Sequence, residues 1–119
     1  MKDKILKHLY DVKDAALTIM RFVEGKTFDD YKKNALLRSG VERKFEIVGE
    51  ALNRIKRDAP EMLDQIREHR SIISFRNILI HGYNGISNRI VWGIIEEDID
   101  NLIEDVAILI KDNDRTNKD

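Results

Sequence analysis

The sequence predicts an all-α fold, an antiparallel bundle of three long helices with shorter helices between them. Apolar residues recur at intervals of three and four over most of the chain, which is the spacing of one face of an α-helix. Only one proline and six glycines interrupt the 119 residues. No segment shows the alternating pattern of a β-strand, and no linker or internal repeat is visible. We therefore expect a single helical domain.

The first long helix is predicted from an apolar stripe that runs through Ile5, Leu9, Val12, Ala16, Ile19 and Val23. Gly25 is placed to cap its C-terminal end. Thr27 and Asp30 then have the spacing of residues that cap the start of a helix, so a short second helix is expected there.

The second long helix is predicted from the apolar residues Leu37, Val41, Phe45, Val48, Leu52 and Ile55. It must end before Pro60, because a proline disfavours helical backbone in the residue that precedes it. Pro60 itself suits the first turn of a short segment that runs to about Glu68.

The third long helix is expected to begin after Ser87 and to carry Val91, Ile95, Ile99, Leu102, Val106 and Leu109. Before it, Ser71 is placed to cap a helix that reaches about His81, and Gly82, Asn84 and Gly85 indicate a loop. We expect the helical domain to span residues 1–111 and the polar residues 112–119 to form a frayed tail.

Composition excludes several classes of protein. With 21 basic and 22 acidic residues the net charge is -1, which argues against a general nucleic-acid coat protein. The chain has no cysteine, so disulfides and thiolate metal sites are excluded, and a reducing cytoplasm is the expected location. No apolar run approaches the ~18 residues of a membrane span, and no signal peptide is visible.

The candidate site is the segment that contains Arg76, His81 and Tyr83. Arginine is a permanent cation that binds phosphate, and histidine transfers protons near neutral pH, so the pair suggests phosphodiester chemistry. Asn77 lies one helical turn before His81 and could orient its imidazole. Three other roles stay open: His81 as a capping or core residue, Arg76 in a salt bridge to Glu46 or Glu50, and Tyr83 as a packing aromatic.

Other chemistries fit the residues less well. The histidines are His8, His69 and His81, and no two have the spacing of metal ligands. Glu46 and Glu50 share a helix face, but no Glu-x-x-His segment accompanies them as in a di-metal bundle. No glycine-rich phosphate loop follows a strand. Acid–base chemistry without a metal or other cofactor is therefore the expectation.

The helix that carries the candidate site is apolar around most of its circumference. Ile72, Phe75 and Leu79 form one face, and Ile73 and Ile80 lie on another. A helix of this kind is normally buried on most sides. Three long helices from one chain cannot easily cover it, so we expect a second copy of the chain to do so in a homodimer.

Arg76, Asn77, His81 and Tyr83 resemble the motif of the HepT-like branch of the HEPN superfamily, in which Arg, four residues, His, one residue and Tyr follow one another. The segment 45–51, with glycine between two glutamates, is similar to the second-helix signature of that family. Trp92 stands in a similar apolar and aromatic run. The resemblance extends from about Ile5 to Ile110.

The resemblance implies a HEPN-like helical toxin of a prokaryotic toxin–antitoxin pair that acts as a metal-independent endoribonuclease on RNA. Arg76 and His81 would be the catalytic pair, with Asn77 in support. The usual partner is a minimal nucleotidyltransferase antitoxin, which would silence the toxin by adenylylating Tyr83. A homodimer would bring two arginines and two histidines to one composite site. Two alternatives are a non-catalytic subunit that binds a nucleotidyltransferase and nucleotide, and a purely structural helical dimer.

Overall fold

The computed structural model describes residues 2–81 and 87–118, and within them the side chains of residues 3–77 and 87–114. All the elements in these ranges are helices: α1 (Lys2–Val23), α2 (Phe28–Lys33), α3 (Ala35–Asp58), α4 (Pro60–Leu63), α5 (His69–His81), α6 (Asn88–Glu97) and α7 (Ile99–Lys118). The predicted all-α class is confirmed.

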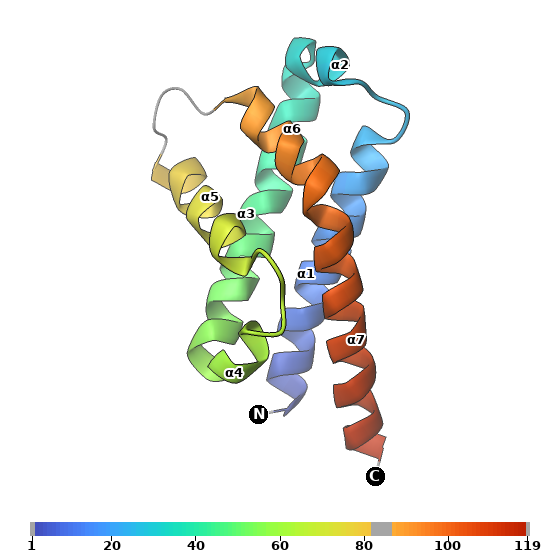
Figure 1. The fold of residues 1–119 in the computed structure, drawn as a ribbon, viewed down its shortest axis with the longest axis vertical. Helices are drawn as coiled ribbons and strands as arrows, with labels where there is room; N and C mark the ends of the chain where they lie inside the picture. The colour runs from blue at the N-terminus through green and yellow to red at the C-terminus, as the bar shows by residue number, and fades with distance from the viewer. Residues whose placement is uncertain (1, 82–86, 119) are drawn as a thin grey trace.

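The three longest helices form the body of the molecule. The helix α1 packs against both α3 and α7, and it runs antiparallel to each of them (Figure 1). On the other side of α3 lies α5, which carries the candidate site, while α6 packs on α2 and α7. The candidate site is therefore attached to the bundle mainly through α3.

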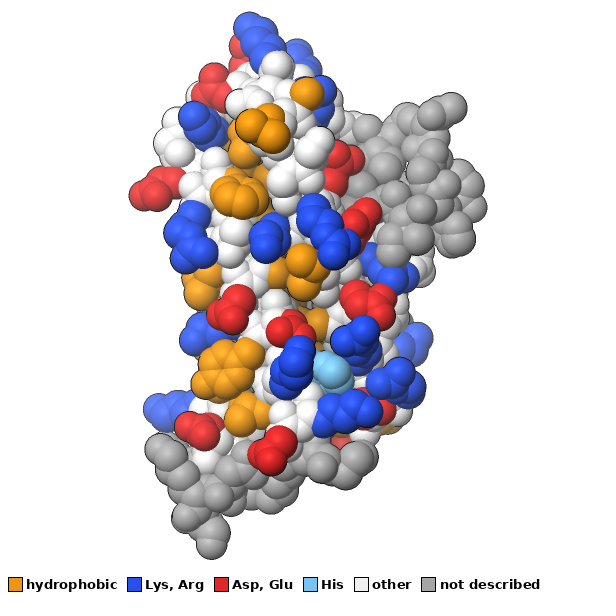
Figure 2. Space-filling model, turned by 180° about the vertical axis from the view of Figure 1, so that it is seen from behind, with side chains coloured by type: hydrophobic (Ala, Val, Ile, Leu, Met, Phe, Trp, Pro, Cys, Tyr) orange, Lys and Arg blue, Asp and Glu red, His pale blue; other side chains and the backbone are white. Residues whose placement is uncertain are grey.

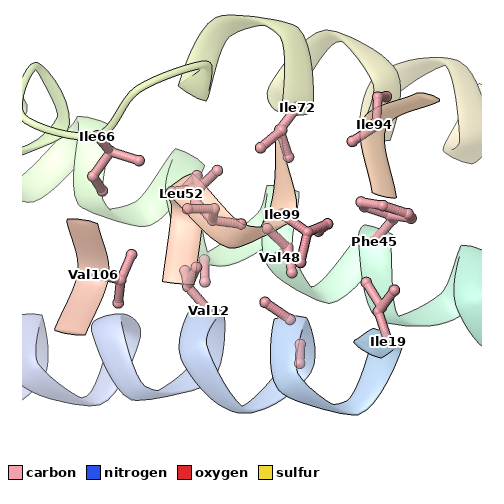
Figure 3. Packing of buried hydrophobic residues seen from close by; sticks show 14 of the residues in the cluster. Val12, Ile19, Phe45, Val48, Leu52, Ile66, Ile72, Ile94, Ile99 and Val106 are labelled. Carbon is pink, nitrogen blue, oxygen red and sulfur yellow. The ribbon is translucent and has the colours of Figure 1, made fainter. Parts of the chain in front are cut away.

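The core is formed by the apolar stripes that the sequence pattern predicted. Val12 and Ile19 from α1, Leu52 from α3 and Val106 from α7 point into the same interior (Figure 3). Leu52 and Val106 are fully buried. Burial of one such side chain contributes about 1.5–3 kcal/mol, so these contacts carry most of the favourable free energy of folding.

Two predicted helix boundaries are confirmed by hydrogen bonds. The backbone N–H of Asp30 donates to the Thr27 hydroxyl at 3.1 Å, and the backbone N–H of Thr27 donates to the Asp30 carboxylate at 2.9 Å. Gly25 has a φ of +72°, and the N–H of Lys26 donates to the carbonyl of Val23 at 2.9 Å. The left-handed backbone at this position is the reason that a glycine follows α1.

The start of α5 differs from the prediction. The helix begins at His69 and not after Ser71, because Glu68 takes the left-handed conformation with φ of 63° and accepts a hydrogen bond from the N–H of Ile72. The preceding helix α4 is also shorter than expected and ends at Leu63. Arg67 binds Asp105 of α7 through its backbone N–H and its guanidinium, and this long-range contact leads the chain away from the helical path.

The predicted third long helix is divided into α6 and α7 at Asp98. The N–H of Asp98 donates to the carbonyl of Ile94 at 2.8 Å, and its carbonyl accepts from Leu102 at 3.0 Å, so the chain bends there with its hydrogen bonds maintained. The bend lets α6 pack on α2, where Trp92 contacts Tyr31, while α7 packs on α1. A continuous apolar stripe cannot reveal that its two halves cover different partners.

The helix α7 continues to Lys118, beyond the helix end expected near residue 111. The division into a domain of residues 1–111 and a tail of residues 112–119 stays a prediction. None of the described helices combines the length and apolar character that crossing a membrane requires.

Candidate functional site

Arg76 lies on α5 at the point where this helix crosses α3. Its Nη2 atom forms an ion pair with Oε2 of Glu50 on α3, and its Nη1 atom donates to Oδ1 of Asn77 at 3.1 Å. Of the two acidic partners that the sequence allowed, Glu50 is the one used, since Glu46 pairs with Arg43 instead. The salt-bridge role of Arg76 is therefore real, and it coexists with any role in binding a phosphate.

Gly49 makes this crossing possible. A Cβ atom built at Gly49 would overlap the Cβ and Cγ atoms of Arg76 and would lie 3.2 Å from its Cδ atom. The stem of Arg76 therefore rests directly on the backbone of α3. In the sequence this glycine stood out only through a family resemblance, and the structure supplies its physical reason.

The guanidinium of Arg76 is incompletely satisfied. Its side chain is only 19% exposed, and its buried Nε atom has no hydrogen-bond partner within the described residues. A buried donor without an acceptor costs about 1–3 kcal/mol, and more when it is charged. The Nε atom has almost no exposed surface, so a ligand could accept from it only if the Arg76 side chain changed its rotamer.

A pocket of about 420 Å³ lies beside Arg76 between α1, α3 and α5. Its charged lining residues are Asp11, Arg43, Glu46, Glu50, Arg54 and Arg76. Glu50 links two of the arginines, because its Oε1 atom is 3.4 Å from Nε of Arg54. Arg43 and Arg54 were not predicted as site residues, although the four-residue spacing of Glu50 and Arg54 on one helix face was a usable signal.

The charges around this pocket balance one another. Three arginines face three carboxylates in its lining. Basic and acidic side chains are also interspersed over the face of the molecule shown in Figure 2. The site therefore depends on placed arginines and not on a large positive field, in agreement with the net charge of -1.

The structure describes the other predicted site residues only in part. His81 is the last residue of α5, four intervening residues after Arg76, and its side chain lies outside the described part. Tyr83 also lies outside the described residues. Asn77 is exposed and accepts a hydrogen bond from Arg76, and its expected contact with His81 stays a prediction.

Two further histidines are in described parts of the chain. His8 of α1 is buried, its Nε2 atom lies 3.7 Å from the Asp58 carboxylate, and burial lowers its pKa. His69 is partly buried at the start of α5. Within residues 2–81 and 87–118, no three or more His, Cys, Asp or Glu residues are grouped so that they could hold a metal ion.

Comparison with known proteins places the chain in a family. The family model described as "Ribonuclease HepT-like" matches residues 12–108, which include α3, α5 and α6. The chain belongs to the HepT-like ribonuclease family. The resemblance inferred from Arg76, Asn77, His81 and Tyr83 is thereby confirmed at the level of the family.

Several relatives of this HepT-like chain cover nearly its whole length. A Methanocaldococcus jannaschii protein named "Putative RNase" is 31% identical over 108 residues, which are 91% of this chain and 98% of the relative. A Thermococcus cleftensis protein named "Probable ribonuclease HepT" is 31% identical over 102 residues, covering 86% of this chain and 92% of the relative. No solved structure gives a significant match.

Proposed function

We propose that this HepT-like chain is a metal-independent endoribonuclease in which Arg76 and His81 form the catalytic pair. The observation that carries the proposal is Arg76 itself, a partly buried cation seated beside a pocket on the helix that ends at His81. The names of the relatives, which include a ribonuclease HepT, support the same reaction class.

RNA can be cleaved by such a pair because it carries its own nucleophile. The 2′-oxygen bonds to the adjacent phosphorus, the bond from phosphorus to the 5′-oxygen breaks, and a cyclic phosphate remains. One group takes the proton of the 2′-hydroxyl, and another gives a proton to the departing oxygen. Arg76 stabilises the charge on the phosphorane, and His81 transfers a proton.

The test compares Arg76→Ala and His81→Ala with Arg70→Ala, which removes an exposed arginine from the same helix. Loss of a proton-transfer group is expected to slow RNA cleavage by about 100- to 10,000-fold, and Arg70→Ala should cleave at nearly the original rate. Cleavage should continue in EDTA and leave a cyclic phosphate end. Activity that disappears with EDTA, or that survives in His81→Ala, contradicts the mechanism.

The proposed enzyme is a homodimer with a composite site. One chain contributes one His81, whereas the reaction uses both a base and an acid, and two copies facing each other across α5 would supply both. Ile73 of α5 is only partly buried in the single chain. Ile73→Glu should weaken association, because a charge would be buried without a partner. Sedimentation of the unsubstituted protein as a monomer at micromolar concentration would rule out this arrangement.

We also propose that the protein is a toxin of the prokaryotic cytoplasm, silenced by a minimal nucleotidyltransferase that adenylylates Tyr83. An added phosphate near Arg76 would compete with the RNA phosphate. Tyr83→Phe should keep ribonuclease activity and escape silencing by the partner with ATP and magnesium. Mass spectrometry should find the added mass on the Tyr83 peptide, and an unmodified peptide in a silenced complex would contradict the proposal.

A second candidate function is a non-catalytic subunit that binds a nucleotidyltransferase and nucleotide. The ion pair between Arg76 and Glu50 favours it, because it gives Arg76 a structural role without any reaction. Calorimetry with ATP and a cleavage assay separate the two functions: nucleotide binding without cleavage supports the second.

A further inference from the structure

A second pocket, of about 540 Å³, lies between the start of α2 and the outer side of α6, apart from the pocket beside Arg76. It is lined by the cations Lys26 and Arg89, the rings of Phe28 and Trp92, the backbone at Gly93, and the acids Glu96 and Glu97. The helix α6 begins at Asn88, shortly after α5 ends at His81, so this pocket follows the proposed catalytic helix closely in the chain.

One wall of the pocket is aromatic. The ring of Trp92 lies 5.5 Å from the ring of Tyr31 and 6.3 Å from the ring of Phe28, with tilted planes in both pairs. Tyr31 is fully buried, whereas Trp92 and Phe28 are partly exposed. The buried ring thus fixes Trp92 from within the protein and leaves part of its surface open to the pocket.

Two cations, Lys26 and Arg89, line this pocket. The guanidinium carbon of Arg89 lies 4.8 Å from the centre of the Phe28 ring, which orders the side chain by a cation–π contact. Neither Arg89 nor the exposed Lys26 forms an ion pair within the described part of the chain. Glu96 and Glu97 also line the pocket, and they lie at the opposite end of α6 from Arg89.

The floor of the pocket is open because of Gly93. A Cβ atom built at Gly93 has no other atom within 4 Å, in contrast to Gly49 in α3. A glycine in the middle of a helix costs about 1 kcal/mol relative to alanine, and here no close packing explains it. The glycine leaves room for a flat group beside Trp92.

We propose that this pocket binds an unstacked base of single-stranded RNA, with the base against Trp92 and the adjoining phosphates at Arg89 and Lys26. Aromatic rings beside unpaired cations are the combination that binds single strands, because every base has a flat face and every nucleotide a phosphate. The pocket would hold the strand while another phosphate occupies the site at Arg76. This inference rests on the proposed ribonuclease function.

Trp92 is the only tryptophan in the chain, so its fluorescence reports on the pocket directly. The probe is a 2′-O-methyl RNA of about eight nucleotides, a length that one single-strand site covers. It lacks the attacking hydroxyl and stays intact with the unsubstituted protein. Titration should quench Trp92 to saturation, whereas the same oligomer in a duplex should not quench it. Absence of quenching by the single strand overturns the proposal.

The matched variants are Gly93→Leu, which fills the pocket, and Gly93→Ala, which adds only a methyl group. Both replace glycine by a better helix former at an uncrowded position, so both should fold. The anisotropy of a labelled oligomer measures the affinity. Gly93→Leu should bind about tenfold more weakly, which corresponds to the loss of one stacked base, and Gly93→Ala should lose much less affinity. Equal affinity of Gly93→Leu and the unsubstituted protein would overturn the proposal.

A second pair of variants tests the charges. Arg89→Ala should weaken binding by about the same factor, while Lys111→Ala, which removes an exposed cation from α7, should bind as the original does. Equal losses in the two variants would show a nonspecific charge effect and overturn the proposal. Quenching without cleavage of unmodified RNA would contradict the ribonuclease function and leave the pocket standing. Cleavage without quenching would overturn the base-binding pocket and leave the ribonuclease function standing.

Discussion

Arg67 and Arg76 are near neighbours in the sequence, yet the structure uses them in opposite ways. Arg67 is 51% exposed, but its Nε and Nη2 atoms donate to the two oxygens of Asp105 at 3.0 and 2.9 Å. Arg76 is 19% exposed and has one acidic partner, Glu50, which is itself 44% exposed and shared with Arg54. The more buried arginine is the less satisfied one.

The difference separates a structural arginine from a candidate functional one. The bidentate pair of Arg67 and Asp105 holds the segment between α4 and α5 against α7, and both oxygens of the Asp105 carboxylate accept hydrogen bonds. Arg76 lies beside a pocket, and its buried Nε has no hydrogen-bond partner among the residues that the structure describes. Proteins keep such unsatisfied groups at a cost in stability, and a functional role for Arg76 would explain that cost.

The largest expected difference between the two arginines is in RNA cleavage. Arg76→Lys should slow cleavage about 10- to 100-fold, because a lysine point charge replaces a planar fork and loses about 1.5–3 kcal/mol of charged hydrogen bonding. Arg67→Lys should cleave at nearly the original rate. Single-turnover rates on one RNA measure both, and a similar loss in the two variants would end the functional distinction.

Gly49 and Gly93 provide a matched test of how Arg76 is seated. Gly49→Ala should be destabilising, since overpacking costs about 1–3 kcal/mol and exceeds the helix propensity gained. Gly93→Ala should stabilise by up to about 1 kcal/mol, because nothing lies near the new methyl group. Urea denaturation compares the two, and a stable, fully active Gly49→Ala would show that α5 does not need its close approach to α3.

Asp105→Asn should reduce the free energy of unfolding by about 1–3 kcal/mol at neutral pH, because charged hydrogen bonds from Arg67 are lost. Those hydrogen bonds hold the pKa of the Asp105 carboxyl below its usual value of 3.8. Because the pKa of Asp105 is lower in the folded than in the unfolded protein, its ionised carboxylate stabilises the fold at pH values above the unfolded-state pKa. This stabilisation is lost as the pH falls through the folded-state pKa. The difference in the free energy of unfolding between Asp105→Asn and the unsubstituted protein should therefore be constant above about pH 5 and should decrease below about pH 4. A gap independent of pH down to acid unfolding would contradict this account.

The smallest expected effect on stability is that of Glu50→Gln. The Glu50 carboxylate is about half exposed, and exposed ion pairs contribute about 0–1 kcal/mol. Thermal unfolding should therefore change less in Glu50→Gln than in Asp105→Asn. A larger loss in Glu50→Gln would mean that the pair with Arg76 is mainly structural, and it would favour the non-catalytic function.

The regular parts of the fold were predictable because they depend on local periodicity. Thr27, Asp30 and Gly25 mark helix ends through short-range hydrogen bonds and backbone conformation, and the structure confirms all three. The start of α5 at His69 and the bend at Asp98 were missed. Each depends on a contact between distant elements, Arg67 with Asp105 in one case and α6 with α2 in the other.

The sequence by itself determined the helical class, the stripes that form the core, and the spacing that brings Arg76 and His81 onto one helix. These features depend on residues within one or two turns of one another, so the order of residues is enough to specify them. Only the tertiary structure decided that Arg76 rests on Gly49, that it pairs with Glu50 and not Glu46, and that its Nε has no partner within the described part of the chain. These features depend on how closely α5 approaches α3, and packing across the whole bundle sets that distance.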